Sequence, residues 1–171
     1  MTTLTLPGFY LKNKDWAEEI AGQLGDNIPT KILYYRHWET GNPRDFDLEH
    51  EVEKALRLIA AGQANVIAKS IGTLITMYIL KKLPQQIERV ILCGIPLNDF
   101  SAEDKKQFMV LVNFPIEKIL IFQNEQDPHG TYPQAKEFLG AINPQINIVS
   151  KPRDDHEYPY PEEFRNFLLS S

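Results

Sequence analysis

The chain has 171 residues, of which 43% are hydrophobic and 24% are charged, and its formal net charge is −5 at pH 7. This length supports one substantial hydrophobic core and is too short for two ordinary domains, so we expect a single domain over residues 1–171. The Lys and Arg residues are scattered, which argues against a nucleic acid as the main partner, because a phosphate backbone requires a concentrated basic face. No apolar run approaches the length of a membrane span.

The sequence lacks the residues for several kinds of structural and binding site. Cys93 is the single cysteine, so no disulfide can form within the chain, and the N-terminus has no signal-peptide pattern. We therefore expect a cytoplasmic protein. The four histidines show no metal-ligand spacing, Gly8 stands alone after the first apolar run, and no G-K-[ST] motif occurs. The sequence thus predicts neither a metal nor a bound cofactor.

Along the chain, short apolar runs alternate with segments of helical periodicity, a pattern typical of a parallel sheet covered by helices on both faces. The predicted strands lie at 3–6, 31–35, 65–69, 89–93, 118–122 and 146–150. The predicted helices lie at 15–24, 48–61, 71–82, 102–111, 132–141 and 161–169. The fold class is therefore α/β, with a three-layer, doubly wound and mainly parallel sheet of six strands.

Ser70 lies where the third predicted strand meets a predicted helix, within Ala68-Lys69-Ser70-Ile71-Gly72. A tight turn here exposes the serine hydroxyl beside free N–H groups at the helix start, and it requires small residues two positions before and after the serine. Ala68 and Gly72 meet that requirement. The alternative interpretation is a serine that simply caps the helix.

Polar side chains also follow the later strands, and the carboxyl ends of parallel strands share one edge of the sheet. Asp127 follows the fifth predicted strand, and His156 follows the sixth. The spacing around Ser70 resembles the G-x-S-x-G nucleophile elbow of the α/β-hydrolase family, with Ala68 in place of the first glycine. The order Ser70, Asp127, His156 is also that of the family's catalytic triad.

The resemblance implies that Ser70 is the nucleophile, His156 the general base and Asp127 the residue that orients the base. Asn124 replaces the glycine usual in the turn before the acid, and asparagine tolerates a left-handed backbone. Other candidates remain open at this stage. They are Asp99 and Glu125 as the acid and His129 as the base.

The same resemblance implies an oxyanion hole and a substrate cleft. Ile71 N–H is one expected oxyanion donor, and the second is expected from the turn after the first strand, from Phe9 rather than Tyr10. Tyr10, Trp38 and Phe100 are candidates for the edge of the cleft, although each could equally be a core residue.

The family core has eight strands, and this chain resembles its minimal, lidless members, without the first two strands. The function implied is hydrolysis of a small ester or thioester through an acyl-enzyme, with a small acyl compound as the substrate. The alternative is a catalytically silent, hydrolase-like protein that binds a small ligand or a protein partner.

Overall fold

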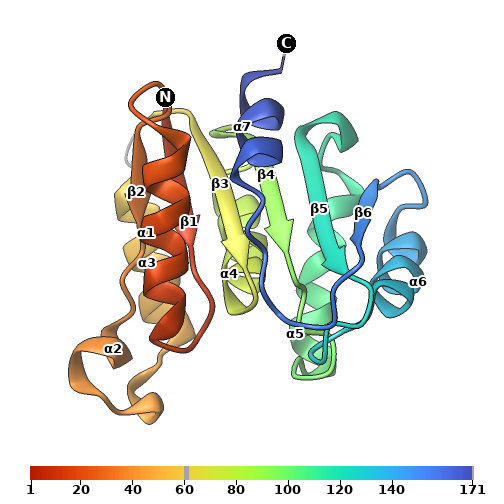
Figure 1. Cartoon of the computed structure of the whole chain (residues 1–171), viewed down its shortest axis with the longest axis horizontal. Coiled ribbons are helices and arrows are strands. Elements are labelled where there is room, and N and C mark those ends of the chain that lie inside the picture. Colours follow the sequence, from red (N-terminus) through yellow and green to blue (C-terminus); the bar gives the residue numbers. More distant parts are fainter. Residues whose placement is uncertain (60–61, 171) are drawn as a thin grey trace.

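A computed structural model describes residues 1–59 and 62–170. Its centre is a six-stranded sheet in the order β2-β1-β3-β4-β5-β6, in which every neighbouring pair is parallel. The strands are β1 (Thr2–Leu6), β2 (Thr30–Ile32), β3 (Ala64–Lys69), β4 (Ile87–Cys93), β5 (Ile119–Asn124) and β6 (Ile148–Lys151). All six end at the lower edge of the sheet in Figure 1.

Helices cover both faces of the sheet, as Figure 1 shows. On one face lie α1 (Lys12–Leu24) and α7 (Pro161–Leu169). On the other lie α3 (Leu48–Ile59), α4 (Ile71–Lys82), α5 (Ala102–Gln107) and α6 (Tyr132–Ile142). The remaining elements are α2 (Arg36–Thr40) and the 3-10 helices Pro43–Asp45, Phe108–Val112 and Ile116–Lys118.

The central strands are apolar throughout because both of their faces are buried. Every residue of β3 is buried, and its side chains alternate between the two halves of the core. Val66 packs with α3 and α4, while Ile67 packs with α1 and α7. Two apolar layers on a single sheet confirm the predicted three-layer α/β architecture.

Most predicted boundaries fall within a few residues of the observed ones, with two exceptions. The second strand was predicted over 31–35, but it ends at Ile32 and the chain then enters α2, which the sequence did not predict. Beyond Leu33, whose N–H still donates to the Thr5 oxygen of β1, the Arg36 N–H donates to the buried carboxylate of Glu51 on α3 at 2.8 Å. The segment predicted as a helix over 102–111 is α5 followed by a 3-10 helix.

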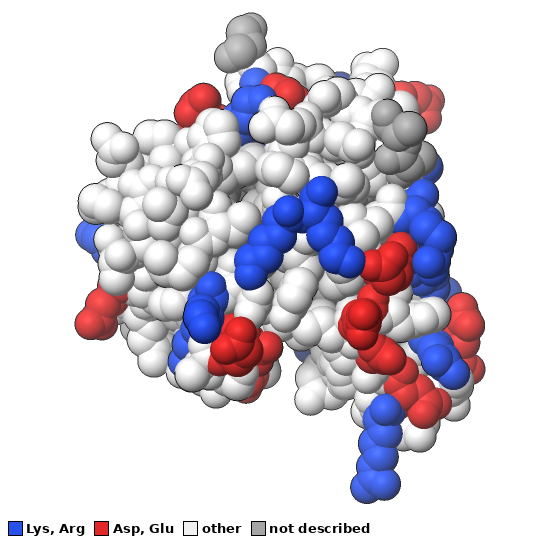
Figure 2. All heavy atoms as spheres, turned by 180° about the vertical axis from the view of Figure 1, so that it is seen from behind, with Lys and Arg blue, Asp and Glu red and all other residues white. Residues whose placement is uncertain are grey.

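The helix predicted over 48–61 is observed as far as Ile59, and residues 60 and 61 lie outside the described part of the chain. No helix in the described ranges combines the length and apolar character that crossing a bilayer requires. On the face shown in Figure 2, acidic side chains lie beside the Lys and Arg side chains instead of leaving one continuous basic patch.

Candidate active site

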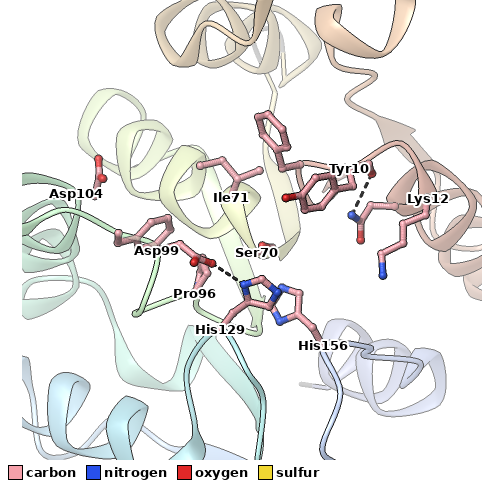
Figure 3. Close-up of a pocket in the computed structure, with 12 residues that line it drawn as sticks. Tyr10, Lys12, Ser70, Ile71, Pro96, Asp99, Asp104, His129 and His156 are labelled. Carbon is pink, nitrogen blue, oxygen red and sulfur yellow. Dashed lines mark hydrogen bonds and ion pairs between the residues drawn. The ribbon is translucent and has the colours of Figure 1, made fainter. Parts of the chain in front are cut away.

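A cavity of about 360 Å³ opens at the carboxyl edge of the sheet, as expected for a doubly wound fold. Most of the residues predicted for the site line it, as Figure 3 shows. These are Phe9, Tyr10, Ser70, Ile71, Phe100 and His156. Asp127 lies behind His156, and Trp38 is not part of the lining.

Ser70 has the strained backbone of a sharp strand-to-helix turn, with φ 56° and ψ −121°. It is the only residue other than glycine with a positive φ within residues 1–59 and 62–170. Such a conformation is costly and persists only where the surrounding structure enforces it. The Ser70 side chain makes no capping hydrogen bond to α4, so the alternative interpretation as a helix cap is wrong.

Gly72 allows the turn to pack closely on the neighbouring strand. A Cβ atom at this position would lie 2.3 Å from the carbonyl oxygen of Leu6. Leu6 pairs with Ala68 in the sheet, so the end of β1 lies directly beside the turn. The nearest obstacle to a side chain at position 72 is therefore the backbone of β1.

His156 and Asp127 form a hydrogen-bonded pair beside the serine turn. The Nδ1 atom of His156 lies 2.6 Å from Asp127 Oδ2, and the carboxylate is completely buried. Because a carboxylate can only accept, Nδ1 carries the proton and Nε2 of the neutral ring keeps its lone pair. Nε2 is buried and has no partner among the described residues, and no hydrogen bond there joins it to Ser70 Oγ.

Two further groups donate to Asp127, and neither was predicted from the sequence. Tyr158 Oη donates to Oδ2 at 2.6 Å, and the backbone N–H of His129 donates to Oδ1 at 2.8 Å. Burial and the adjacent Asp127 charge raise the pKa of Tyr158 far above its usual value, so its hydroxyl stays protonated. With His156, Asp127 thus accepts three hydrogen bonds, which fix the orientation of its carboxylate.

The prediction for Asn124 is wrong in its conformation. Asn124 is the last residue of β5 and does not have a left-handed backbone. Its buried side chain instead donates to the carbonyl oxygens of Asp155 and Glu157, at 2.9 and 2.8 Å. Asn124 therefore holds the loop that carries His156, a role that turn statistics cannot reveal.

The alternative candidates Asp99 and His129 pair with each other. His129 Nδ1 lies 2.6 Å from Asp99 Oδ2, and both residues line the cavity. The His129 and His156 rings lie side by side, with centroids 4.4 Å apart (Figure 3). This second pair is much more exposed than the first. Glu125 is absent from the lining, and its side chain contacts Ser150.

Lys69, directly before Ser70, is buried rather than directed into the cleft. Its Nζ atom lies 2.7 Å from Glu157 Oε2, and Lys12 binds the other oxygen of the same carboxylate at 3.2 Å. Burial lowers the pKa of Lys69, and the Glu157 carboxylate opposes this shift. The ion pair thus joins the residue before Ser70 to the residue after His156.

On the oxyanion side, Ile71 and Phe9 both border the cavity. Ile71 is the first residue of α4, where a backbone N–H has no acceptor within the helix. Trp38, predicted at the edge of the cleft, borders an adjacent cavity together with Phe9 and Tyr10, and its indole N–H donates to the Phe9 carbonyl oxygen at 2.8 Å. Its aromatic ring packs against Tyr35.

Within the described ranges, no group of three or more His, Cys, Asp or Glu side chains is arranged to hold a metal ion. The residues at the cavity are those of acid–base and nucleophilic chemistry. They provide a hydroxyl on a strained turn, an imidazole with a free lone pair, and a buried carboxylate.

No family model and no curated protein matches this sequence. Solved structures resemble it closely in shape. Mouse alpha/beta hydrolase domain-containing protein 10 aligns at a TM-score of 0.67 and 13% identity, covering 98% of this chain and 87% of that one. Est1E from Butyrivibrio proteoclasticus, solved with ferulic acid, aligns at a TM-score of 0.63 and 16% identity, covering 98% of this chain and 88% of that one.

A carboxylesterase from Bacillus cereus aligns at a TM-score of 0.60 and 14% identity, over 97% of this chain and 86% of that one. These likenesses extend over nearly the whole chain at very low sequence identity. The protein therefore has the α/β-hydrolase fold.

Proposed function

We propose that this protein is a serine hydrolase that cleaves a small ester or thioester through an acyl-enzyme on Ser70. The observation that carries the proposal is the His156–Asp127 pair beside a serine held at φ 56° in the same cavity. A serine that only capped a helix would need neither the strain nor the histidine. The three neighbours described above are a carboxylesterase, an esterase solved with ferulic acid and a protein named as a hydrolase, which agrees with this chemistry.

In the acylation half of the reaction, Ser70 Oγ attacks the substrate carbonyl carbon while its proton moves to His156 Nε2. The carbonyl oxygen becomes an oxyanion, which the N–H groups of Ile71 and Phe9 stabilise, each donor contributing on the order of 3 kcal/mol. His156 then protonates the departing alcohol or thiol, and the acyl group remains on Ser70. Asp127 stabilises the imidazolium that forms between these two steps.

In the second half, His156 removes a proton from water, which attacks the acyl carbonyl carbon. The acid is released, and the proton returns to Ser70 Oγ. The cavity of about 360 Å³ lies near the lower end of ligand-site volumes, which favours a small substrate. Tyr10 and Phe100, which both line the cavity, are the proposed apolar contacts.

The first test is covalent labelling with a fluorophosphonate probe, read by intact mass and peptide mapping. We expect one adduct, on Ser70, which is lost in Ser70→Ala and slowed in His156→Ala. Ser150→Ala is the matched control, because its hydroxyl makes only one long hydrogen bond outside the cavity, and it should label normally. Folded protein that fails to label would favour the alternative, a catalytically silent protein that binds a ligand or partner.

The second test is turnover of p-nitrophenyl esters and acyl thioesters of increasing acyl length. We expect short chains to be preferred, and Ser70→Ala to lower kcat by on the order of 10⁴-fold or more. If Ser70→Ala retained activity at every chain length, the proposed nucleophile would be wrong.

A further inference from the structure

The loop between β1 and α1 carries the proposed oxyanion donor Phe9, so the inference below rests on the proposed function. Residues 7–10 belong to no strand or helix. Phe9 and Tyr10 line the cavity, and neither backbone N–H donates to an acceptor within the described part of the chain. A loop amide stabilises an oxyanion only when its direction is held before the reaction begins. The question is what holds this loop.

Two side chains converge on the carbonyl oxygen of Phe9. His37 Nε2 lies 2.7 Å from it, and Trp38 Nε1 lies 2.8 Å from it. A carbonyl oxygen can only accept, so both nitrogens donate, and the neutral His37 ring has its proton on Nε2. His37 is 5% exposed and stacks on the Phe9 ring, with centroids 4.4 Å apart and an interplanar angle of 22°.

The two hydrogen bonds to the Phe9 carbonyl oxygen also fix the direction of the Tyr10 N–H, which belongs to the same peptide group. In a planar trans peptide the C=O and N–H bonds point in opposite directions, so the Tyr10 N–H is directed away from His37 and Trp38. The proposed donor, the Phe9 N–H, belongs to the preceding peptide, so these bonds constrain it through the position of the Phe9 Cα atom, which the two peptides share. Two donors on one oxygen resist both rotation and translation of this peptide group.

Neighbouring carbonyls of the loop are held in the same way. Tyr35 Oη donates to the Pro7 oxygen at 2.5 Å, and the Asn13 side chain donates to the Tyr10 oxygen at 3.0 Å. Gly8 leaves room for Asn13, because a Cβ there would lie 2.7 Å from its side-chain nitrogen. The donors to Pro7 and Phe9 come from one segment, residues 35–38, which leads into and begins α2.

We propose that His37 and Trp38 are positioning residues, which hold the oxyanion loop in its catalytic conformation through the carbonyl oxygen of Phe9. Neither acts on the substrate directly. Their contribution therefore appears in stabilisation of the transition state and not in binding of the substrate ground state.

The test compares variants with and without the donor atom. Trp38→Phe removes the indole N–H and keeps an aromatic ring. His37→Leu removes the imidazole donor, whereas His37→Gln can present an amide N–H to the same oxygen. Tyr34→Phe is the control, because it removes a hydroxyl hydrogen bond from the adjacent surface without touching the loop.

With a p-nitrophenyl ester, we expect Trp38→Phe and His37→Leu each to lower kcat roughly tenfold with KM within about twofold of wild type. Inhibition by a trifluoromethyl ketone, which forms an oxyanion adduct with the serine, should weaken by the same factor. His37→Gln should recover most of kcat, and Tyr34→Phe should change neither constant. Thermal unfolding is measured in parallel to identify variants that fail to fold.

The outcomes separate this inference from the proposed function. If wild type is active, Ser70→Ala is inactive, and folded Trp38→Phe and His37→Leu keep wild-type kcat and ketone affinity, the positioning role is wrong and the serine mechanism stands. A rise in KM at constant kcat would also overturn it, since the residues would then contribute to substrate binding. If Ser70→Ala itself stays active, the proposed function is wrong, and the positioning role that rests on it is wrong as well.

Discussion

At the scale of single residues, the environment of Asp127 is the most constrained part of the site. Its buried carboxylate accepts from His156, Tyr158 and the backbone of His129, and has no exposure to solvent. Hydrogen bonds to a charged group are worth about 1.5–3 kcal/mol each. Tyr158 therefore contributes to holding the Asp127 carboxylate in place, although it does not line the substrate cavity.

Tyr158→Phe should lower kcat about tenfold with little change in KM, since the loss of one such bond weakens the support of the imidazolium. It should also lower the free energy of unfolding by about 1–2 kcal/mol, because Asn124 N–H donates to the same hydroxyl at 3.0 Å. Steady-state kinetics and urea unfolding measure the two effects.

Tyr160→Phe is the matched control for this substitution. Its hydroxyl donates to the Asn124 side chain at 2.9 Å and does not touch Asp127. We expect kcat to remain within about twofold of wild type. Equal losses of kcat in the two variants would show that Tyr158 acts through the fold and not through Asp127.

At the scale of elements, the junction of β3 and α4 is held by its neighbours on both sides. Ser70 N–H donates to the Cys93 oxygen of β4 at 3.0 Å, and Thr73 Oγ1 and N–H both donate to the Ser70 oxygen. On the other side, Gly72 lies against Leu6 of β1. The positive φ of Ser70 therefore follows from the position of the turn between two strands.

Gly72→Ala should lower the free energy of unfolding by about 3 kcal/mol, because the new methyl group meets a strand backbone that cannot move aside. Any folded fraction should also lose activity, since relief of the clash displaces Ser70. Chemical denaturation and ester turnover report the two effects.

Gly22→Ala is the control for this substitution, and it should raise the stability instead of lowering it. Gly22 lies within α1 with nothing within 4 Å of the added atom, so the substitution should stabilise the protein by about 0.5–1 kcal/mol. A Gly72→Ala variant as stable as Gly22→Ala would contradict the close approach of the turn to β1.

At the scale of the whole molecule, one ion network joins segments that are far apart in sequence. Glu157 in the loop after β6 binds Lys69 at the end of β3 and Lys12 at the start of α1. Burial tends to raise the pKa of Glu157, but the hydrogen bonds and charges of Lys69 and Lys12 outweigh it, and the net shift is downward. A carboxyl group with a lowered pKa in the folded state stabilises the protein above its unfolded pKa.

Stability should therefore fall as pH drops from about 5 toward 3, through the unfolded pKa of about 4.3 and then the lower folded value. At the acid end of this window Glu157 is protonated, and buried Lys69 loses its counter-charge. Glu157→Gln should melt at a lower temperature than wild type at pH 7 and show a shallower decline of Tm with acid. Calorimetry from pH 3 to pH 7 measures how Tm changes with pH in wild type and in Glu157→Gln.

Glu18→Gln is the control for this pH dependence, because its pair with Lys14 is exposed and 3.9 Å long, and such pairs contribute little. Its Tm should follow the wild-type curve. Identical slopes for Glu157→Gln and wild type would show that the network contributes nothing to acid stability.

Much of this molecule could be predicted from local pattern alone. The alternation of apolar runs and amphipathic segments indicated six strands and the fold class, because burial of both faces of a parallel sheet constrains every strand position. Ser70, Asp127 and His156 each follow a strand, and such positions share one edge, but it was the resemblance to the α/β-hydrolase triad that favoured them over Asp99, Glu125 and His129. Short α2 had no such signal, and the hydrogen bond from its first N–H, at Arg36, to Glu51 on another helix is a contact that periodicity does not reveal.

By itself, the sequence determined the architecture and the residues that meet at the edge of the sheet, since periodicity and chain order are local properties. Only the tertiary structure decided their partners. It showed that Tyr158 donates to Asp127, that His129 pairs with Asp99, and that Trp38 donates to the Phe9 carbonyl oxygen. Those contacts join residues up to 31 positions apart, and the direction of a side chain across such a gap depends on how the packed layers meet.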